Sequence, residues 1–229
     1  MKKKLLVLLA VLLLATLTAC GGGAEDKDNT PGTDAGTDEG GKFDNYKSGE
    51  FVEIMESGTY YLDYSAFVSG IESSMKMAVD GSDSSVEISG IGYPVRILTL
   101  DGKMYYINDE KKVYMLMEGE ATTDPVDSGI FDYSGIEFGA DGSGPISDLA
   151  GIDDNSYDYE EFNMGAGQEE VIVRYYFKSD NLYAIEVKMG GVGSTMVINE
   201  LTKDIPNGLM ETPAGYELVD ETTFFLSMS

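Results

Sequence analysis

Carboxylates are the most abundant side chains in this sequence that could do chemistry, but no pair of them stands out. The 229 residues include 41 Asp and Glu, 15 Lys and Arg, no His and no Trp. A glycosidase would place two carboxylates about 5–10 Å apart, and Asp153, Asp154 and Asp158 are candidates for that role. A sugar subsite usually adds an aromatic platform, often Trp. Because Trp is absent, we favour a solvated acidic loop over a catalytic pair.

The remaining reactive groups do not fit the common kinds of active site. Without His, the chain has no imidazole base, no Ser-His-Asp or Cys-His nucleophile and no imidazole metal ligand. The single Cys cannot form an internal disulfide or a thiolate zinc cluster. We therefore expect a protein that is not an enzyme and has no cofactor. An unrecognised hydrolase is the enzymatic alternative.

Metal and phosphate motifs are also absent from the sequence. The segments Asp80–Asp83 and Asp153–Asp158 are rich in oxygen ligands, but neither fits the EF-hand calcium loop. We expect weak adventitious binding of divalent cations there and no dedicated metal site. The glycines of Gly190–Gly193 precede a predicted strand and open no helix, so we interpret them as a turn and not as a phosphate cradle.

The net charge of −26 restricts the partners of the protein. Phosphate binding needs clustered Lys and Arg, so no nucleic-acid partner is expected. The same charge opposes spontaneous adhesion to an anionic membrane surface. The chain is nevertheless 42% hydrophobic, with 15 Tyr and 9 Phe, and can bury the core of one domain.

The single Cys lies at the end of a segment typical of a signal peptide. Lys2–Lys4 precede the apolar run Leu5–Leu17, which is shorter than the roughly 18 residues that a membrane-spanning helix needs. The run ends in Leu17-Thr18-Ala19-Cys20, which resembles the bacterial lipobox. The resemblance implies that residues 1–19 are removed and that the Cys20 thiol carries diacylglycerol. We then expect a lipid anchor on the extracytoplasmic face of the cell membrane. An ordinary secretory signal is the alternative.

Residues 20–45 are expected to form a disordered acidic linker that begins with the lipidated Cys. The segment is acidic and holds almost no large apolar side chain, so little would offset the entropy cost of ordering it. As a coil it would span on the order of 25–30 Å. A functional acidic motif is the alternative to a spacer. The folded domain is then residues 46–229.

A short helix over residues 48–57 is predicted to open this domain. Ser48 can cap its start, acidic residues occupy its first turns, and Gly58 lies just past its end. One face of the helix is apolar at i, i+3 and i+4. This face consists of Phe51, Ile54 and Met55.

From residue 59 onward the apolar period changes to two, which is typical of half-buried strands. Several segments place apolar side chains on one parity: Tyr60, Leu62 and Tyr64; Met75, Met77 and Val79; Val86 and Ile88; Val171, Val173 and Tyr175. The pair Asp101-Gly102 between two such segments is typical of a type I′ hairpin turn. Because tight turns join consecutive strands, we predict an antiparallel meander. Residues 119–156 are predicted to be an irregular connection with one helical turn near Ser147–Ala150.

The sequence contains 12 Met, many of them on predicted strands. Met is flexible and polarisable, and it is common where a surface adapts to varied apolar partners. These side chains either fill an irregular core under a curved sheet or line a cavity for a flexible apolar ligand. Those on predicted strands are Met75, Met77, Met104, Met115, Met117, Met189 and Met196.

The order of these segments resembles the lipoprotein-carrier superfamily, which includes LolA, LolB and the mycobacterial lipoproteins LppX and LprG. The resemblance rests on the strand pattern of Asn181–Glu200 and on the proline-flanked segment Ile205–Tyr216. It implies an α+β fold in which an antiparallel sheet curves into a half barrel, with helices over the concave face and an apolar cavity between them. Members bind acyl chains and have no catalytic residues. Two departures are a thin helical lid and the lipidation of this chain itself, which suits a receptor or glycolipid carrier better than a soluble shuttle.

We therefore expect a membrane-tethered extracytoplasmic lipoprotein that binds or transfers a lipid or other apolar ligand. The alternative is a structural or signalling surface lipoprotein with a filled core and an acidic protein-interaction face. In the first interpretation the apolar parities form one concave surface with the helix across it. The candidate ligand contacts are Phe51, Ile54, Met55, Tyr60, Leu62, Tyr64, Met75, Met77, Val79, Val171, Val173 and Tyr175.

Overall fold

The computed structural model describes residues 43–68, 70–90, 94–117, 136–150, 152–166, 169–189 and 192–228. The predicted signal peptide, Cys20 and the linker up to residue 42 lie outside the described residues. So do residues 119–135 and 151 of the predicted connection, and Gly190 and Gly191 of the predicted turn.

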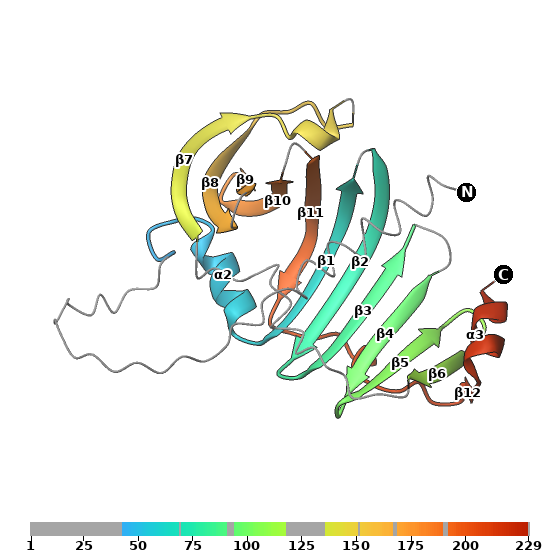
Figure 1. The fold of residues 1–229 in the computed structure, drawn as a ribbon. Coiled ribbons are helices and arrows are strands. Elements are labelled where there is room, and N and C mark those ends of the chain that lie inside the picture. Colours follow the sequence, from blue (N-terminus) through green and yellow to red (C-terminus); the bar gives the residue numbers. More distant parts are fainter. Residues whose placement is uncertain are drawn as a thin grey trace, which may run out of the picture.

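The described chain forms one open, curved sheet with two short α-helices packed against it (Figure 1). The first half contains α2 (Gly49–Glu56), β1 (Thr59–Val68), β2 (Ile71–Asp80), β3 (Asp83–Ser89), β4 (Val95–Leu100), β5 (Lys103–Asn108) and β6 (Val113–Met117). The second half contains β7 (Ile136–Gly144), the 3₁₀ turn η2 (Ser147–Leu149), β8 (Tyr157–Ala166), β9 (Glu169–Lys178), β10 (Asn181–Met189), β11 (Val192–Thr202), β12 (Glu217–Leu218) and α3 (Glu221–Ser227).

The strand order is β12-β6-β5-β4-β3-β2-β1-β11-β10-β9-β8-β7. Two runs of consecutive antiparallel strands, β1 to β6 and β7 to β11, meet where β1 pairs with β11. The sheet is therefore not one meander, and it is mixed because β12 pairs in parallel with β6. The prediction of purely antiparallel pairing was wrong there, since the chain after β11 is long enough to cross the sheet to its far edge. The open, curved arrangement is consistent with a half barrel of α+β class.

Helix α2 forms where the sequence predicts it, but its start is capped differently. Ser48 has helical dihedral angles (φ −66°, ψ −14°) and makes no side-chain cap. Instead, the Glu160 carboxylate of β8 accepts hydrogen bonds from the Ser48 N–H at 2.9 Å, the Ser48 hydroxyl at 2.8 Å and the Lys47 N–H at 2.8 Å. The carboxylate satisfies free N–H groups and complements the helix dipole. A strand far along the chain thus holds the helix in place.

Residues just before α2 also belong to the packed structure. Phe43 is 4% exposed, and its ring centroid lies 5.1 Å from that of Phe162 on β8. Phe43 falls within the predicted linker, residues 20–45, because the residues around it are polar. Its packing adds an aromatic anchor immediately before the helix.

Two local predictions can be compared with the backbone directly. Asp101 and Gly102 both have positive φ, +52° and +70°, and join β4 to β5 as a type I′ turn requires. In contrast, β7 was missed, because its sequence is rich in Gly and was interpreted as irregular. A Cβ at Gly142 would lie 2.8 Å from the Tyr159 hydroxyl. Glycine is therefore needed here for the Tyr159 ring to lie across β7.

Candidate functional site

All of the candidate ligand contacts lie in one apolar cluster on the side of the sheet beneath α2, which we call the inner face. The cluster is built from alternate residues of neighbouring strands, as the period of two predicts. Its buried candidates are Phe51, Met55, Tyr60, Leu62, Tyr64, Val79, Val173 and Tyr175. Its half-buried candidates are Ile54, Met75, Met77 and Val171.

Directly under α2 the inner face is filled by side chains. The Phe51 ring lies 5.8 Å from the Tyr175 ring, and Leu62 and Val79 are at most 1% exposed. Sequence reasoning missed several members of this cluster, although the strand members lie on predicted or newly found strands with the same alternation. The missed buried members are Phe43, Val52, Ala66, Phe162, Phe177, Ile185 and Met196.

The inner face continues beyond α2 across the other half of the sheet. The register aligns Met77 with Val86, Val86 with Ile97, and Ile97 with Tyr106. These side chains are half-buried. Further half-buried apolar side chains on this face are Met75, Ile88, Val95 and Met104.

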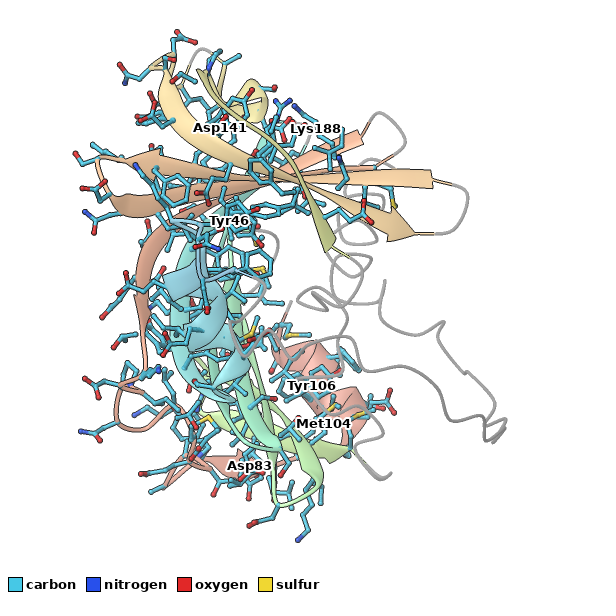
Figure 2. All side chains as sticks on the ribbon, turned by 90° about the vertical axis from the view of Figure 1, so that its left-hand side faces the viewer. Tyr46, Asp83, Met104, Tyr106, Asp141 and Lys188 are labelled. Atoms are coloured by element: carbon cyan, nitrogen blue, oxygen red, sulfur yellow. The ribbon has the colours of Figure 1, made fainter. Side chains whose placement is uncertain are left out.

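Helix α3 closes the far end of the inner face. Its Phe224 is fully buried, with the ring centroid 6.4 Å from that of Tyr106. Figure 2 shows Met104 and Tyr106 on the side of the sheet where α3 lies. Helix α2 packs against β1 and α3 packs against β6, and a band of half-buried apolar residues on β2–β5 lies between them (Figure 1). We call this band the inner band.

The opposite side of the same strands, which we call the outer face, combines fully buried side chains with half-buried ones such as Lys76, Glu87 and Tyr105. Ala78 and Leu98 are 0% exposed. Next to them, the Arg96 guanidinium forms hydrogen bonds of 3.1 and 3.2 Å to both carboxylate oxygens of Asp109. The third nitrogen, Nη1, donates to backbone carbonyls within residues 208–211, at 3.3 to 3.5 Å. The segment that leads to β12 is thereby held across the sheet.

A second polar network on the outer face connects η2 with β9 and β10. The Glu186 side chain is 0% exposed, and its carboxylate accepts from the Tyr176 hydroxyl at 3.0 Å and from the Ser147 N–H at 3.3 Å. Lys188 Nζ lies 2.9 Å from it and Arg174 Nη1 lies 3.8 Å away. The sequence carries no local signal for this, because Glu186 lies among alternating strand residues like any solvent-facing acid.

Tyr60 and Tyr64 bring hydroxyl groups into the apolar cluster. The Tyr60 hydroxyl contacts the Met77 sulfur at 3.5 Å, and the Tyr64 hydroxyl contacts the Met75 sulfur at 3.1 Å. Burial raises the pKa of Tyr60 to about 12. Burial, and secondarily the nearby Tyr60, raises the pKa of Tyr64 above its ordinary value. Both groups are therefore neutral hydrogen-bond donors at physiological pH.

A hollow of about 250 Å³ opens beside α2, between the helix and β10–β11. Apolar side chains of both elements line it: Phe51, Ile54, Leu182, Ile198 and Leu201. Its rim is charged, with Lys47, Glu50, Asp180 and Glu200. Since Phe51 and Ile54 also belong to the inner-face cluster, the hollow connects solvent with the packed side of the helix.

In the acidic loop considered for catalysis, two of the carboxylates accept hydrogen bonds from neighbouring side chains. Asp153 accepts from the Tyr157 hydroxyl at 2.7 Å and from the Tyr183 hydroxyl at 2.8 Å, and these hydrogen bonds lower its pKa to about 2. Asp158 accepts from the Ser143 hydroxyl at 2.6 Å. Within the described ranges, no group of three or more acidic or Cys side chains is placed to hold a metal ion.

No protein-family model matches the sequence, and no curated protein matches it. Among solved structures, the chain is similar to the crystal structure of LprF from Mycobacterium bovis, with a TM-score of 0.40 and 9% identity. The match covers 72% of this chain and 98% of that one. In the part of the chain that the structure describes, neither α-helix has the length and apolar character needed to cross a membrane.

Proposed function

We propose that the protein binds a lipid or another molecule with a flexible acyl chain on the inner band, and that it does so without catalysing a reaction. The observation that carries this proposal is the half-buried apolar band of β2–β5 between α2 and α3. Apolar area of this kind on a folded domain is typical of a binding surface. In full, the proposal is a lipoprotein that holds or transfers such a ligand while anchored through Cys20.

The chemistry of the inner band suits an acyl chain. Its Met75, Met77 and Met104 side chains are flexible and polarisable, so they can follow a chain that bends. A bound chain would gain about 0.8 kcal/mol for each CH₂ group removed from water, before the costs of association. Such a ligand needs length and apolar contact, with few polar partners.

The filled region under α2 favours the second candidate, a structural or signalling scaffold. Phe51, Leu62 and Val79 beneath the helix are at most 3% exposed, as expected of an ordinary core. The ligand is therefore placed on the inner band and not directly beneath the helix. Of the twelve candidate contacts, Met75 and Met77 are the ones that lie on the inner band itself.

Native mass spectrometry of the Cys20→Ser chain purified from cells tests the proposal. This substitution removes the covalent lipid, so any lipid mass that remains belongs to a bound ligand. We expect one lipid-sized adduct that is released at higher collision energy. If no adduct is found and a fluorescent acyl probe shows no saturable binding, the scaffold function replaces the lipid-binding function.

The membrane tether is a separate part of the proposal. The lipobox and the presence of a single thiol support acylation of Cys20. The Cys20→Ser chain should move from the membrane fraction to the soluble extracytoplasmic fraction. Its full retention in the membrane fraction would contradict the anchor.

A further inference from the structure

The hydroxyl groups of Tyr60 and Tyr64 form a polar pair within the apolar inner face. Both residues lie on β1, four positions apart and on the same face of the sheet. Their side chains are 4% and 7% exposed. In the described structure the partners of their hydroxyls are the sulfurs of Met77 and Met75, at 3.5 and 3.1 Å.

A thioether sulfur is a weak acceptor, so these hydroxyls are not well satisfied. Phenylalanine would fill the same space without bringing a polar group into an apolar cluster. A buried hydroxyl that lacks a good acceptor is costly, and a carbonyl oxygen would be a stronger partner than sulfur. The two tyrosines are thus placed to gain from an acceptor that a ligand brings.

The methionine partners can give way to such an acceptor. Met75 and Met77 are half-buried and lie on β2, at the border of the inner band. Their side chains have three rotatable bonds, so each sulfur can leave the hydroxyl without a backbone change. The exchange replaces a weak hydrogen bond with a stronger one and brings the ligand's polar group next to the band that holds its chain.

We propose that Tyr60 and Tyr64 donate hydrogen bonds to the ester or amide carbonyl of an acylated ligand. The inference rests on the proposed lipid-binding function and narrows its ligand class to acyl compounds over ether lipids and plain hydrocarbons. A neutral carbonyl fits this place better than a phosphate or carboxylate, because a buried charge is costly without a paired opposite charge. The ester of a glyceride and the amide of an acylated amine share this carbonyl chemistry.

The test compares two lipids of equal chain length, a diacylglycerol with ester carbonyls and the dialkylglycerol ether that lacks them. Binding to the Cys20→Ser chain is measured by displacement of the neutral dye N-phenyl-1-naphthylamine. A second comparison measures the binding of an N-acyl amine and of its N-alkyl analogue, which lacks the carbonyl. It shows whether an amide carbonyl is recognised as well as an ester carbonyl. We expect the chain with Tyr60 and Tyr64 unchanged to bind each carbonyl compound about tenfold more tightly than the analogue without the carbonyl.

The double variant Tyr60→Phe/Tyr64→Phe should bind ester and ether equally within about twofold, with its affinity for the ether unchanged. Tyr61→Phe is the matched control, since Tyr61 is buried on the outer face of the same strand, and it should keep the preference. If the double variant does not fold, the single variant Tyr64→Phe is tested instead. Its preference for the ester should fall from about tenfold to about threefold.

Two results would overturn the inference in different ways. Equal binding of ester and ether before substitution, or a preference that survives in the folded double variant, would refute the tyrosine anchor and leave the lipid-binding function standing. Binding of neither lipid would refute the lipid-binding function and the anchor together.

Discussion

The two faces of strands β2–β5 are covered to different degrees, although both faces belong to the same strands. On the outer face, Ala78 and Leu98 have no exposed surface, and Arg96 holds the segment of residues 208–211, which we call the outer strap. On the inner face of the same strands, Val86 and Ile97 stay half-buried between two helices. Alternation along a strand sets which side chains share a face, but it does not decide how well that face is covered.

The difference shows what closes a sheet face in this protein. The outer strap is fixed by polar groups, chiefly by Arg96, which joins Asp109 to the backbone of residues 208–211. The buried Arg96 guanidinium holds the segment in one position because each of its three nitrogens donates to an oxygen acceptor. The inner band is lined instead by Met and branched apolar side chains, which adapt to a ligand. On β2–β5, we thus expect the outer face to contribute mainly to stability and the inner band to contribute mainly to ligand binding.

Of the changes that test this difference between the two faces, loss of Arg96 should have the largest effect on stability. Arg96→Ala leaves the carboxylate and the strap carbonyls without their donor, and it should lower the free energy of unfolding by about 3 kcal/mol. Chemical denaturation measures this change. Lys203→Ala breaks an exposed ion pair of 3.5 Å with Glu53 and, as a control, should cost at most about 0.5 kcal/mol. Similar losses in the two variants would mean that the strap does not stabilise the outer face.

A charge on the inner band should abolish binding without unfolding the protein. Met77→Lys places an ammonium group where an acyl chain would lie, and it should weaken binding of a fluorescent fatty-acyl probe by at least about 30-fold. The matched control is Ser74→Lys on the outer side of the same strand, which adds the same charge and should leave probe binding unchanged. Far-UV circular dichroism checks that both variants keep the sheet. Equal probe affinity in the two variants would contradict the assignment of the ligand to the inner face.

A change at the β4–β5 turn should affect both faces together. Gly102 has φ +70°, and a β-branched residue adopts this conformation at a cost, so Gly102→Val should lower stability by about 1–2 kcal/mol. The thermal midpoint should fall by a few degrees, as seen by differential scanning calorimetry. Asp101→Asn is a suitable control, because Asn tolerates positive φ. An unchanged midpoint in Gly102→Val would mean that the turn does not constrain the hairpin.

The smallest effect should come from Asp153, whose hydrogen bonds to Tyr157 and Tyr183 support the loop after η2. Its pKa falls to about 2 in the folded protein from 3.8, so the ionised form is favoured by folding. This stability is present above pH 4 and is lost as the pH falls from about 4 to 2. Asp153→Asn should remove roughly 1 kcal/mol of this pH-dependent stability, seen as a flatter pH profile of the urea midpoint. Parallel profiles for the two proteins would show that Asp153 is not a stabilising acceptor.

Local periodicity was sufficient for the elements that depend on nearby residues. The helix at 48–57, the Asp101-Gly102 turn and the shared face of Tyr60, Met77 and Val173 follow from spacing alone, and the structure places them accordingly. The 3₁₀ turn at Ser147–Leu149 likewise falls within the predicted helical turn. None of these features needs information from a distant part of the chain.

The features that could not be predicted depend on contacts between distant residues. The Glu160 carboxylate that caps α2 lies 112 positions from Ser48, and Arg96 reaches carbonyls a similar distance along the chain. Strand β7 forms although its sequence is rich in Gly, which disfavours strands. Its Gly142 leaves space for the side chain of Tyr159, which is distant in the sequence. The position of the proposed ligand also could not be predicted from periodicity, because the same alternation produces a buried core under α2 and a half-buried band beside it.

Photo-crosslinking with a diazirine-labelled fatty acid tests the central claim most directly, since it locates a bound chain on one face or the other. The Cys20→Ser chain is labelled at increasing probe concentration, and fragment mass spectra assign the modified residues. The account predicts saturable labelling of Met75, Met77, Val86 or Ile97 on the inner band, with competition by unlabelled fatty acid. Labelling that does not saturate, or that is confined to exposed apolar residues at the edge such as Leu116, Phe225 and Leu226, would contradict it.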